Sequence, residues 1–96
     1  MADYNFRVTL DRLPLEQPPT ESSRVCFDVS NHDDIFHIID MMSKRPEFTP
    51  EDGKAFAVGL KLMTDVIMRH RNDPFFSELS PHVGDMMKII KRDMKR

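Results

Sequence analysis

The chain has 96 residues, of which 40% are hydrophobic and 31% charged, and its formal net charge is −2. This length predicts a single domain over residues 1–96, and this composition is typical of globular proteins and excludes the disordered class. A pI near 6.0 gives no support to a strongly basic nucleic-acid-binding domain. The charge is uneven, because residues 1–60 carry six Lys/Arg against eleven Asp/Glu (net −5) and residues 61–96 carry eight against five (net +3).

Cysteine content and hydropathy bear on the cellular compartment. Cys26 is the only cysteine, so an internal disulfide is excluded and a reducing compartment is expected. The N-terminus lacks the basic and apolar regions of a secretory signal, and the longest apolar stretch, residues 55–60, is too short to cross a membrane. We therefore expect a cytoplasmic protein with no membrane partner.

Two N-terminal segments alternate between apolar and polar residues, which is the pattern of a strand with one buried face. The apolar positions are Tyr4, Phe6, Val8 and Leu10 in the first segment, and Val25, Phe27 and Val29 in the second. Three prolines between the segments favour an extended connection, too long for a tight hairpin turn. Because a two-stranded sheet is marginal by itself, we expect either helices over its apolar face or strand pairing between two subunits.

Two helices are predicted next. Asn31 is a suitable N-cap for a helix over residues 32–44, which Pro46 would end. A longer second helix begins with Thr49 as N-cap and Pro50 in the first turn. We expect it to end near Asn72, since the residue before Pro74 is biased away from helical geometry.

A third helix is predicted to start at Ser80–Pro81, after a short apolar anchor formed by Phe75, Phe76 and Leu79. The predicted fold class is therefore α+β, with two N-terminal antiparallel β-strands followed by three α-helices packed on one face of the sheet.

The second helix has an unusually broad apolar arc. It contains Ala55, Phe56, Gly59, Leu60, Met63, Val66, Ile67 and His70, and Val58 and Leu62 extend it. This width indicates packing on two sides, one of them against another subunit. The predicted interface residues are Gly59, Met63, Val66 and His70, with His70 a core or interface residue and Gly59 at a close helix contact.

The chain also resembles a known family. The segments that carry the resemblance are YNFRVTLDRL near the start, NHDDIFHIIDMM over residues 31–42, GLKLMTDVIMRHRNDPFF over residues 59–76, and the lysine-rich end. The chain is similar to the small bacterial family catalogued as domain of unknown function 3861. The resemblance implies a bacterial source and an unassigned role, and it assigns no functional residue.

One polar cluster has the residue types of a metal site. Asp33, His37 and Asp40 are spaced one turn apart on the first predicted helix, and such a set could bind a divalent metal. Three ligands on an exposed helix face do not define a closed site, so a solvated face is the preferred interpretation and no metal or other cofactor is expected. Cys26 has no partner base nearby in sequence, and no catalytic residue is predicted.

The C-terminal segment contains Lys88, Lys91 and Arg92, which are possible phosphate contacts. Basic residues also suit the last turn of any helix, so we expect no nucleic-acid partner. The favoured hypothesis is a homodimeric protein-interaction module that binds its own copy or an unknown protein partner. The alternative is a nucleic-acid-associated regulator that uses the basic C-terminal helix, and a small enzyme or metal-binding protein ranks third.

Overall fold

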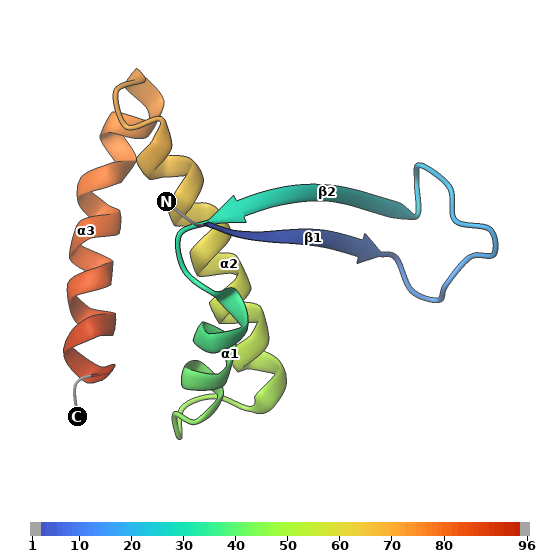
Figure 1. Cartoon of the computed structure of the whole chain (residues 1–96), viewed down its shortest axis with the longest axis horizontal. Helices are drawn as coiled ribbons and strands as arrows, with labels where there is room; N and C mark the ends of the chain where they lie inside the picture. Colours follow the sequence, from blue (N-terminus) through green and yellow to red (C-terminus); the bar gives the residue numbers. More distant parts are fainter. Residues whose placement is uncertain (1–2, 95–96) are drawn as a thin grey trace.

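The computed structural model describes residues 3–94. The order of elements along the chain is β1 (Tyr4–Asp11), β2 (Arg24–Asn31), α1 (Ile35–Ser43), α2 (Pro50–Arg69) and α3 (Pro74–Met94) (Figure 1). The two strands pair antiparallel, and the helices follow them. This order confirms the predicted α+β class with two N-terminal strands and three helices.

The register of the hairpin separates apolar from polar residues. The pairing runs from Tyr4 opposite Asn31 to Asp11 opposite Arg24. The apolar cross-strand pairs are Phe6 with Val29, Val8 with Phe27 and Leu10 with Val25, and the pairs between them are all polar. Since alternate residues of a strand point to opposite faces, the apolar pairs share one face and the polar pairs share the other.

The hairpin projects away from the helices (Figure 1). At its inner end, the ring centroid of Phe6 lies 5.9 Å from that of Phe36 on α1. Towards the tip, Leu10 is 68% exposed and Val25 is 52% exposed. The expectation that the helices cover one face of the sheet is therefore wrong for the outer half of the hairpin.

The core lies mainly between α1 and α2. Its buried apolar residues are Ile35 and Met42 on α1, Ala57, Leu60 and Ile67 on α2, and Val83 on α3. In Figure 1, α1 lies along α2, while α3 turns back from the end of α2 and runs in the opposite direction beside it. The helix pair α1–α2 thus forms the body that carries both the hairpin and α3.

The start of α1 differs from the prediction. The helix begins at Ile35, where the carboxylate of Asp34 accepts a hydrogen bond of 3.1 Å from the backbone N–H of Phe36. Asp34 is therefore the N-cap, and Asn31 instead ends β2 and is buried. Asp34 caps the helix in place of Asn31, because the side-chain amide of Asn31 is hydrogen-bonded to the backbone carbonyl of Lys61 and to the backbone N–H of Asp33.

The start of α2 is confirmed. The hydroxyl of Thr49 accepts a hydrogen bond of 3.1 Å from the backbone N–H of Asp52, and Pro50 occupies the first turn. The helix ends at Arg69 with His70 as its C-cap, slightly before the predicted end near Asn72.

The start of α3 was predicted too late. The helix begins at Pro74, and Pro81 lies inside it. Pro74 is itself well suited to a first turn, and the backbone N–H of Ser77 donates to the carbonyl of Asp73 at 2.8 Å, which closes that turn. The connection between α2 and α3 is therefore residues 70–73, and the predicted anchor residues Phe75, Phe76 and Leu79 belong to α3.

Candidate functional site

Helix α2 presents apolar residues on two sides. Its buried side contains Gly53, Ala57, Leu60, Thr64 and Ile67. Its other apolar side forms an exposed row that we call the α2 open row, which consists of Phe56, Gly59, Met63, Val66 and His70. The apolar arc predicted for this helix is therefore displaced from the buried side, because it omits the buried residues Ala57 and Thr64.

The four predicted interface residues all lie in the α2 open row. Met63 is 47% exposed, and Gly59, Val66 and His70 are exposed as well. Gly59 has open space around the position of a Cβ, with nothing within 4 Å. The close helix contact predicted at Gly59 is thus absent within the described part of this chain, and a role between subunits stays a prediction.

His70 lies at the end of α2 and is not a core residue. Its Nδ1 is 3.8 Å from a carboxylate oxygen of Asp73, and its ring centroid is 5.6 Å from that of Phe76. Of the two alternatives expected for His70, the core is therefore wrong, because α2 ends at this point and the side chain lies at the surface of the α2–α3 turn, and the interface stays a prediction.

An apolar hollow lies between α2 and α3, and we call it the α2–α3 groove. It has a volume of about 530 Å³. Its lining residues are Met63, Val66 and Ile67 from α2, and Phe75, Phe76, Leu79, His82, Val83 and Met86 from α3. A single residue of this set, His82, has a polar side chain, so the groove is suited to apolar side chains from a partner.

The early start of α3 builds one wall of this groove. Phe75 and Phe76 lie in the first turn, with ring centroids 5.0 Å apart in an edge-to-face arrangement. Phe75 is 67% exposed despite its size. Aromatic side chains, phenylalanine among them, are enriched at protein interfaces.

The outer part of the hairpin forms a second exposed apolar surface, which we call the hairpin arm. It consists of the outer strand residues on the apolar face and two leucines in the connecting loop. Its exposed members are Leu10, Leu13, Leu15, Val25 and Phe27. Leu13, at 76%, is the most exposed large hydrophobic residue among those described. Exposed apolar residues grouped in this way mark interaction sites on folded proteins.

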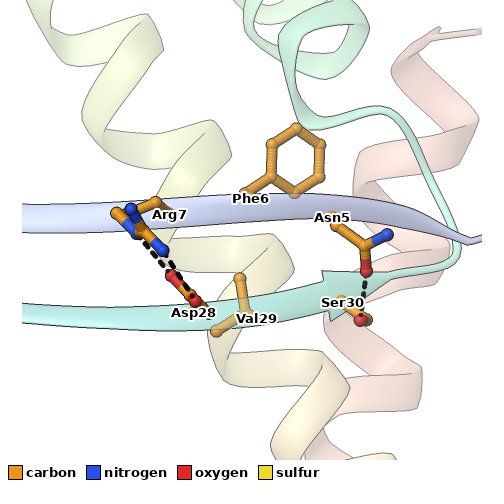
Figure 2. Close-up of a pocket in the computed structure, with 6 residues that line it drawn as sticks. All are labelled: Asn5, Phe6, Arg7, Asp28, Val29 and Ser30. Atoms are coloured by element: carbon orange, nitrogen blue, oxygen red, sulfur yellow. Dashed lines mark hydrogen bonds and ion pairs between the residues drawn. The ribbon is translucent and has the colours of Figure 1, made fainter.

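The opposite face of the hairpin is polar and internally paired. Figure 2 shows Arg7 bridged to Asp28 and Asn5 bridged to Ser30 across the strands, with Arg7 Nε 2.8 Å from Asp28 Oδ1. The hydrogen bond from Arg7 lowers the pKa of the Asp28 carboxyl. Cys26 is exposed on this face. These pairs define the solvent side of the hairpin and leave its apolar side as the side available for contact.

A polar junction fixes the hairpin to α2. The buried amide of Asn31 donates to the backbone carbonyl of Lys61 at 3.2 Å and accepts from the backbone N–H of Asp33 at 3.0 Å. The Lys61 ammonium in turn donates to the Asp33 carboxylate at 2.5 Å, and this hydrogen bond lowers the pKa of the Asp33 carboxyl. The inner end of the arm is therefore held at a defined place on α2.

The structure does not bring together Asp33, His37 and Asp40, the possible metal ligands of the sequence analysis. Asp33 precedes α1 and pairs with Lys61, whereas Asp40 is 3.0 Å from Lys44 on α1, and His37 is exposed on the same helix. Among the side chains that the structure describes, no three from His, Cys, Asp or Glu gather into a possible metal site.

The basic candidates Lys88, Lys91 and Arg92 are exposed on the last turns of α3. Lys88 lies 4.0 Å from Asp85. No helix between residues 3 and 94 has the length and apolar character that crossing a membrane requires.

Sequence reasoning missed both the hairpin arm and the aromatic wall of the groove. A signal for the arm was present, because Leu10, Leu13 and Leu15 continue the apolar residues of the first strand into a proline-rich loop. Because the prolines keep this loop out of the sheet, its leucines are not expected in the core and would be expected at the surface. Phe75 and Phe76 were predicted as an apolar anchor before the third helix, because that helix was predicted to start at Ser80–Pro81 and not at Pro74.

Comparisons with known proteins identify the family. The family model described as "Domain of Unknown Function with solved-structure structure (DUF3861)" matches residues 4–92. A crystal structure of a protein of unknown function from Pectobacterium atrosepticum SCRI1043 is similar, with a TM-score of 0.80, 28% sequence identity, and coverage of 95% of this chain and 99% of that one. Comparison with curated proteins gives no match. The family match confirms the resemblance seen in the sequence, and the chain belongs to the DUF3861 family.

Proposed function

We propose that this protein is a cytoplasmic homodimeric interaction module, which acts by binding and not by catalysis. The observation that carries the proposal is the presence of two exposed apolar surfaces on one small chain, namely the hairpin arm and the α2–α3 groove. Exposed apolar surface of this kind costs free energy in water, and its burial against a partner recovers about 25 cal/mol per Å².

The polar chemistry of the chain supports a binding role. The charged side chains of the two strands and of the polar junction form ion pairs, namely Arg7 with Asp28, Arg24 with Asp11 and Lys61 with Asp33. The groove offers His82 as its one polar side chain, whereas acid–base catalysis needs positioned groups in reach of one another. The exposed thiol of Cys26 suits a reducing cytoplasm.

The test is the mass of the protein in solution. Light scattering after size-exclusion chromatography, and sedimentation equilibrium over a range of micromolar concentrations, should give the mass of a dimer. The Met63→Asp variant places a carboxylate in the groove and should shift the mass to that of a monomer, because an unpaired charge in an interface is strongly unfavourable.

The matched control is Ile89→Asp, which makes the same kind of change at an exposed apolar position of α3 outside the groove lining. It should leave the dimer intact. Circular dichroism should show all three proteins folded. A wild-type protein that stays monomeric at high micromolar concentration would contradict the proposed function.

A further inference from the structure

Resting on the proposed homodimer, we propose that its interface is the α2 open row, which packs antiparallel against the same row of a second copy. Gly59 of each chain lies opposite the partner's Met63, and Val66 lies opposite the partner's Phe56. The two α2 helices are related by a two-fold axis, so every contact occurs twice.

The spacing of the α2 open row indicates that its partner is a helix. Its members follow one another at intervals of three, four, three and four residues, namely Phe56, Gly59, Met63, Val66 and His70. Such a row is the seam along which two helices pack with interdigitated side chains. The buried side of α2 has intervals of four, three, four and three residues, and this seam already carries the contact with α1. Helix α2 thus has one filled seam and one open seam.

The open row is accessible to a second copy. Phe56 is 37% exposed, Met63 47% and Val66 39%, and nothing lies within 4 Å of the Cβ position of Gly59. The polar junction holds the hairpin on the other side of α2. Lys61 is two residues from both Gly59 and Met63, and two residues turn a helix by about 200°. The hairpin therefore does not obstruct the open row.

The sizes of the side chains fix the register. In the proposed register, the two middle layers each combine Gly59 with the partner's Met63, and the layers outside them combine Val66 with the partner's Phe56. Each layer joins a smaller side chain to a larger one, which is how packed helices fill the space between them. The long and flexible side chain of Met63 lies over the backbone of Gly59, so the two helices approach closely.

The ends of the two helices carry opposite charges in this register. Glu51 and Asp52 lie in the first turn of α2, and the partner's His70 and Arg71 follow its last turn. Asp52 then lies opposite the partner's His70, and Glu51 lies near the partner's Arg71. Glu51 also pairs with Lys54 within one chain, but its side chain is 83% exposed and stays accessible. A parallel pair would instead bring the acidic first turns of both copies together, which is unfavourable.

A shift of the register by one heptad removes both kinds of match. In one direction, Asp52 lies opposite the partner's Met63, which places a charge in an apolar layer. In the other direction, Phe56 lies opposite the partner's Asp73, which is beyond the end of α2. The proposed register therefore keeps the largest number of matched layers.

An exchange of side-chain sizes tests the register. Gly59→Met puts two long side chains in one layer, and Met63→Gly leaves a layer without side chains, so each variant alone should weaken the dimer at least about tenfold. The double variant with both changes again has one long side chain in each layer, and its dissociation constant should return to within about threefold of wild type. Sedimentation equilibrium measures the constants, and circular dichroism checks that each variant stays folded.

The matched controls make the same changes outside the open row. Gly84→Met alters a glycine of α3 that also has open space around its Cβ position. Met68→Gly removes an exposed methionine of α2 that does not belong to the row. Both controls should leave the dissociation constant unchanged.

Engineered cysteines test the direction of the helices. Asp52→Cys and His70→Cys are made as separate variants in a Cys26→Ser background, which lacks the native thiol. A short bifunctional thiol reagent should link the two variants to each other in a mixture and leave each variant alone unlinked. Linkage of each variant to its own copy would show a parallel pair and overturn the antiparallel contact.

Other results would overturn the contact and leave the homodimer standing. If both single variants weaken the dimer and the double variant does not recover it, the open row packs against a different element of the second copy. If neither single variant weakens the dimer, the interface lies elsewhere. A wild-type protein that is monomeric at high micromolar concentration has a different meaning, because it removes the proposed function itself.

Discussion

Gly53 at the start of α2 lies directly against Ser43 at the end of α1. A Cβ added to Gly53 would be 2.6 Å from the hydroxyl oxygen of Ser43 and 2.9 Å from its Cα. Since the second atom belongs to the backbone, rotation of the serine side chain cannot relieve the contact. The absence of a side chain at Gly53 therefore allows the last turn of α1 to meet the first turn of α2.

This contact predicts a clear difference between two glycines of one helix. Gly53→Ala should lower the free energy of unfolding by about 1–3 kcal/mol, because overpacking forces the backbones apart. Gly59→Ala, with open space around it, should be neutral or raise that free energy by up to about 1 kcal/mol, the usual preference of a helix for Ala.

Urea denaturation of both variants measures the difference. Ser43→Ala combined with Gly53→Ala should not restore stability, because the backbone of Ser43 stays in place. Equal stability of Gly53→Ala and the wild type would show that the two helix ends separate without cost.

The two glycines also illustrate what the sequence could predict. The strand alternation, the order of elements and the Thr49 cap depend on neighbours in the chain, and they were predicted correctly. Gly59 was chosen as the close contact because it lies in the apolar arc, but the close contact within the chain is at Gly53. Which glycine meets another helix depends on how α1 lies on α2, and periodicity within one helix does not contain that information.

The candidate site shows the same limit. The row of Gly59, Met63, Val66 and His70 was recognised from its spacing, and the structure places all four on one exposed side of α2. The α2–α3 groove was not foreseen, because it requires α3 to begin at Pro74 and to run back beside α2. Two start signals with proline compete there, and the sequence does not show which one packing will favour.

The polar junction predicts an effect of Asn31 on the hairpin. Asn31→Leu should destabilise the protein by about 1–3 kcal/mol, because it removes both hydrogen bonds of the buried Asn31 side chain and leaves the N–H of Asp33 without its acceptor. Hydrogen exchange should then accelerate in both strands more than in α1. The control is Asn5→Ala, which removes an exposed cross-strand hydrogen bond to Ser30 and should have little effect.

A faster exchange in the hairpin of the Asn5→Ala variant, equal to that of Asn31→Leu, would show that cross-strand bonds and not the junction hold the hairpin in place. Unchanged exchange in both variants would mean that the apolar contact between Phe6 and Phe36 is sufficient to anchor it.

The basic end of α3 predicts weak binding of nucleic acid. If Lys88, Lys91 and Arg92 serve the helix end and solubility, mixed DNA and RNA should bind at non-specific strength, about 10⁻⁴–10⁻⁶ M, and lose affinity steeply with salt. Fluorescence anisotropy at several salt concentrations measures this. Lys44→Glu, at the exposed C-cap of α1, is the control for a general change of charge.

Submicromolar binding at physiological salt would support a nucleic-acid-associated regulator instead. In that case the double reversal Lys91→Glu and Arg92→Glu should abolish binding, whereas Lys44→Glu should leave it nearly unchanged. Equal losses in both would indicate that the response follows net charge and not a specific surface.

The Lys61–Asp33 pair predicts a pH-dependent contribution to stability. The hydrogen bond from Lys61 lowers the pKa of Asp33 in the folded state, whereas the unfolded chain has a value of about 3.9. A lowered folded pKa stabilises the protein above the unfolded pKa, and this stabilisation disappears as the pH falls through the folded pKa. The difference in unfolding free energy between wild type and Asp33→Asn should therefore be full at pH 5–7 and shrink below about pH 4.

Because Asp33 is partly exposed to solvent, the difference in unfolding free energy between wild type and Asp33→Asn should stay below about 1 kcal/mol. Urea denaturation at pH 7, 5 and 3 measures it, with closely spaced urea concentrations. Asp40→Asn is the matched control, because its pair with Lys44, the C-cap of α1, joins two exposed side chains and contributes at most about 0.5 kcal/mol. If Asp33→Asn lowers stability equally at pH 3 and pH 7, its effect comes from lost packing or from the amide, and the ion pair with Lys61 does not stabilise the junction.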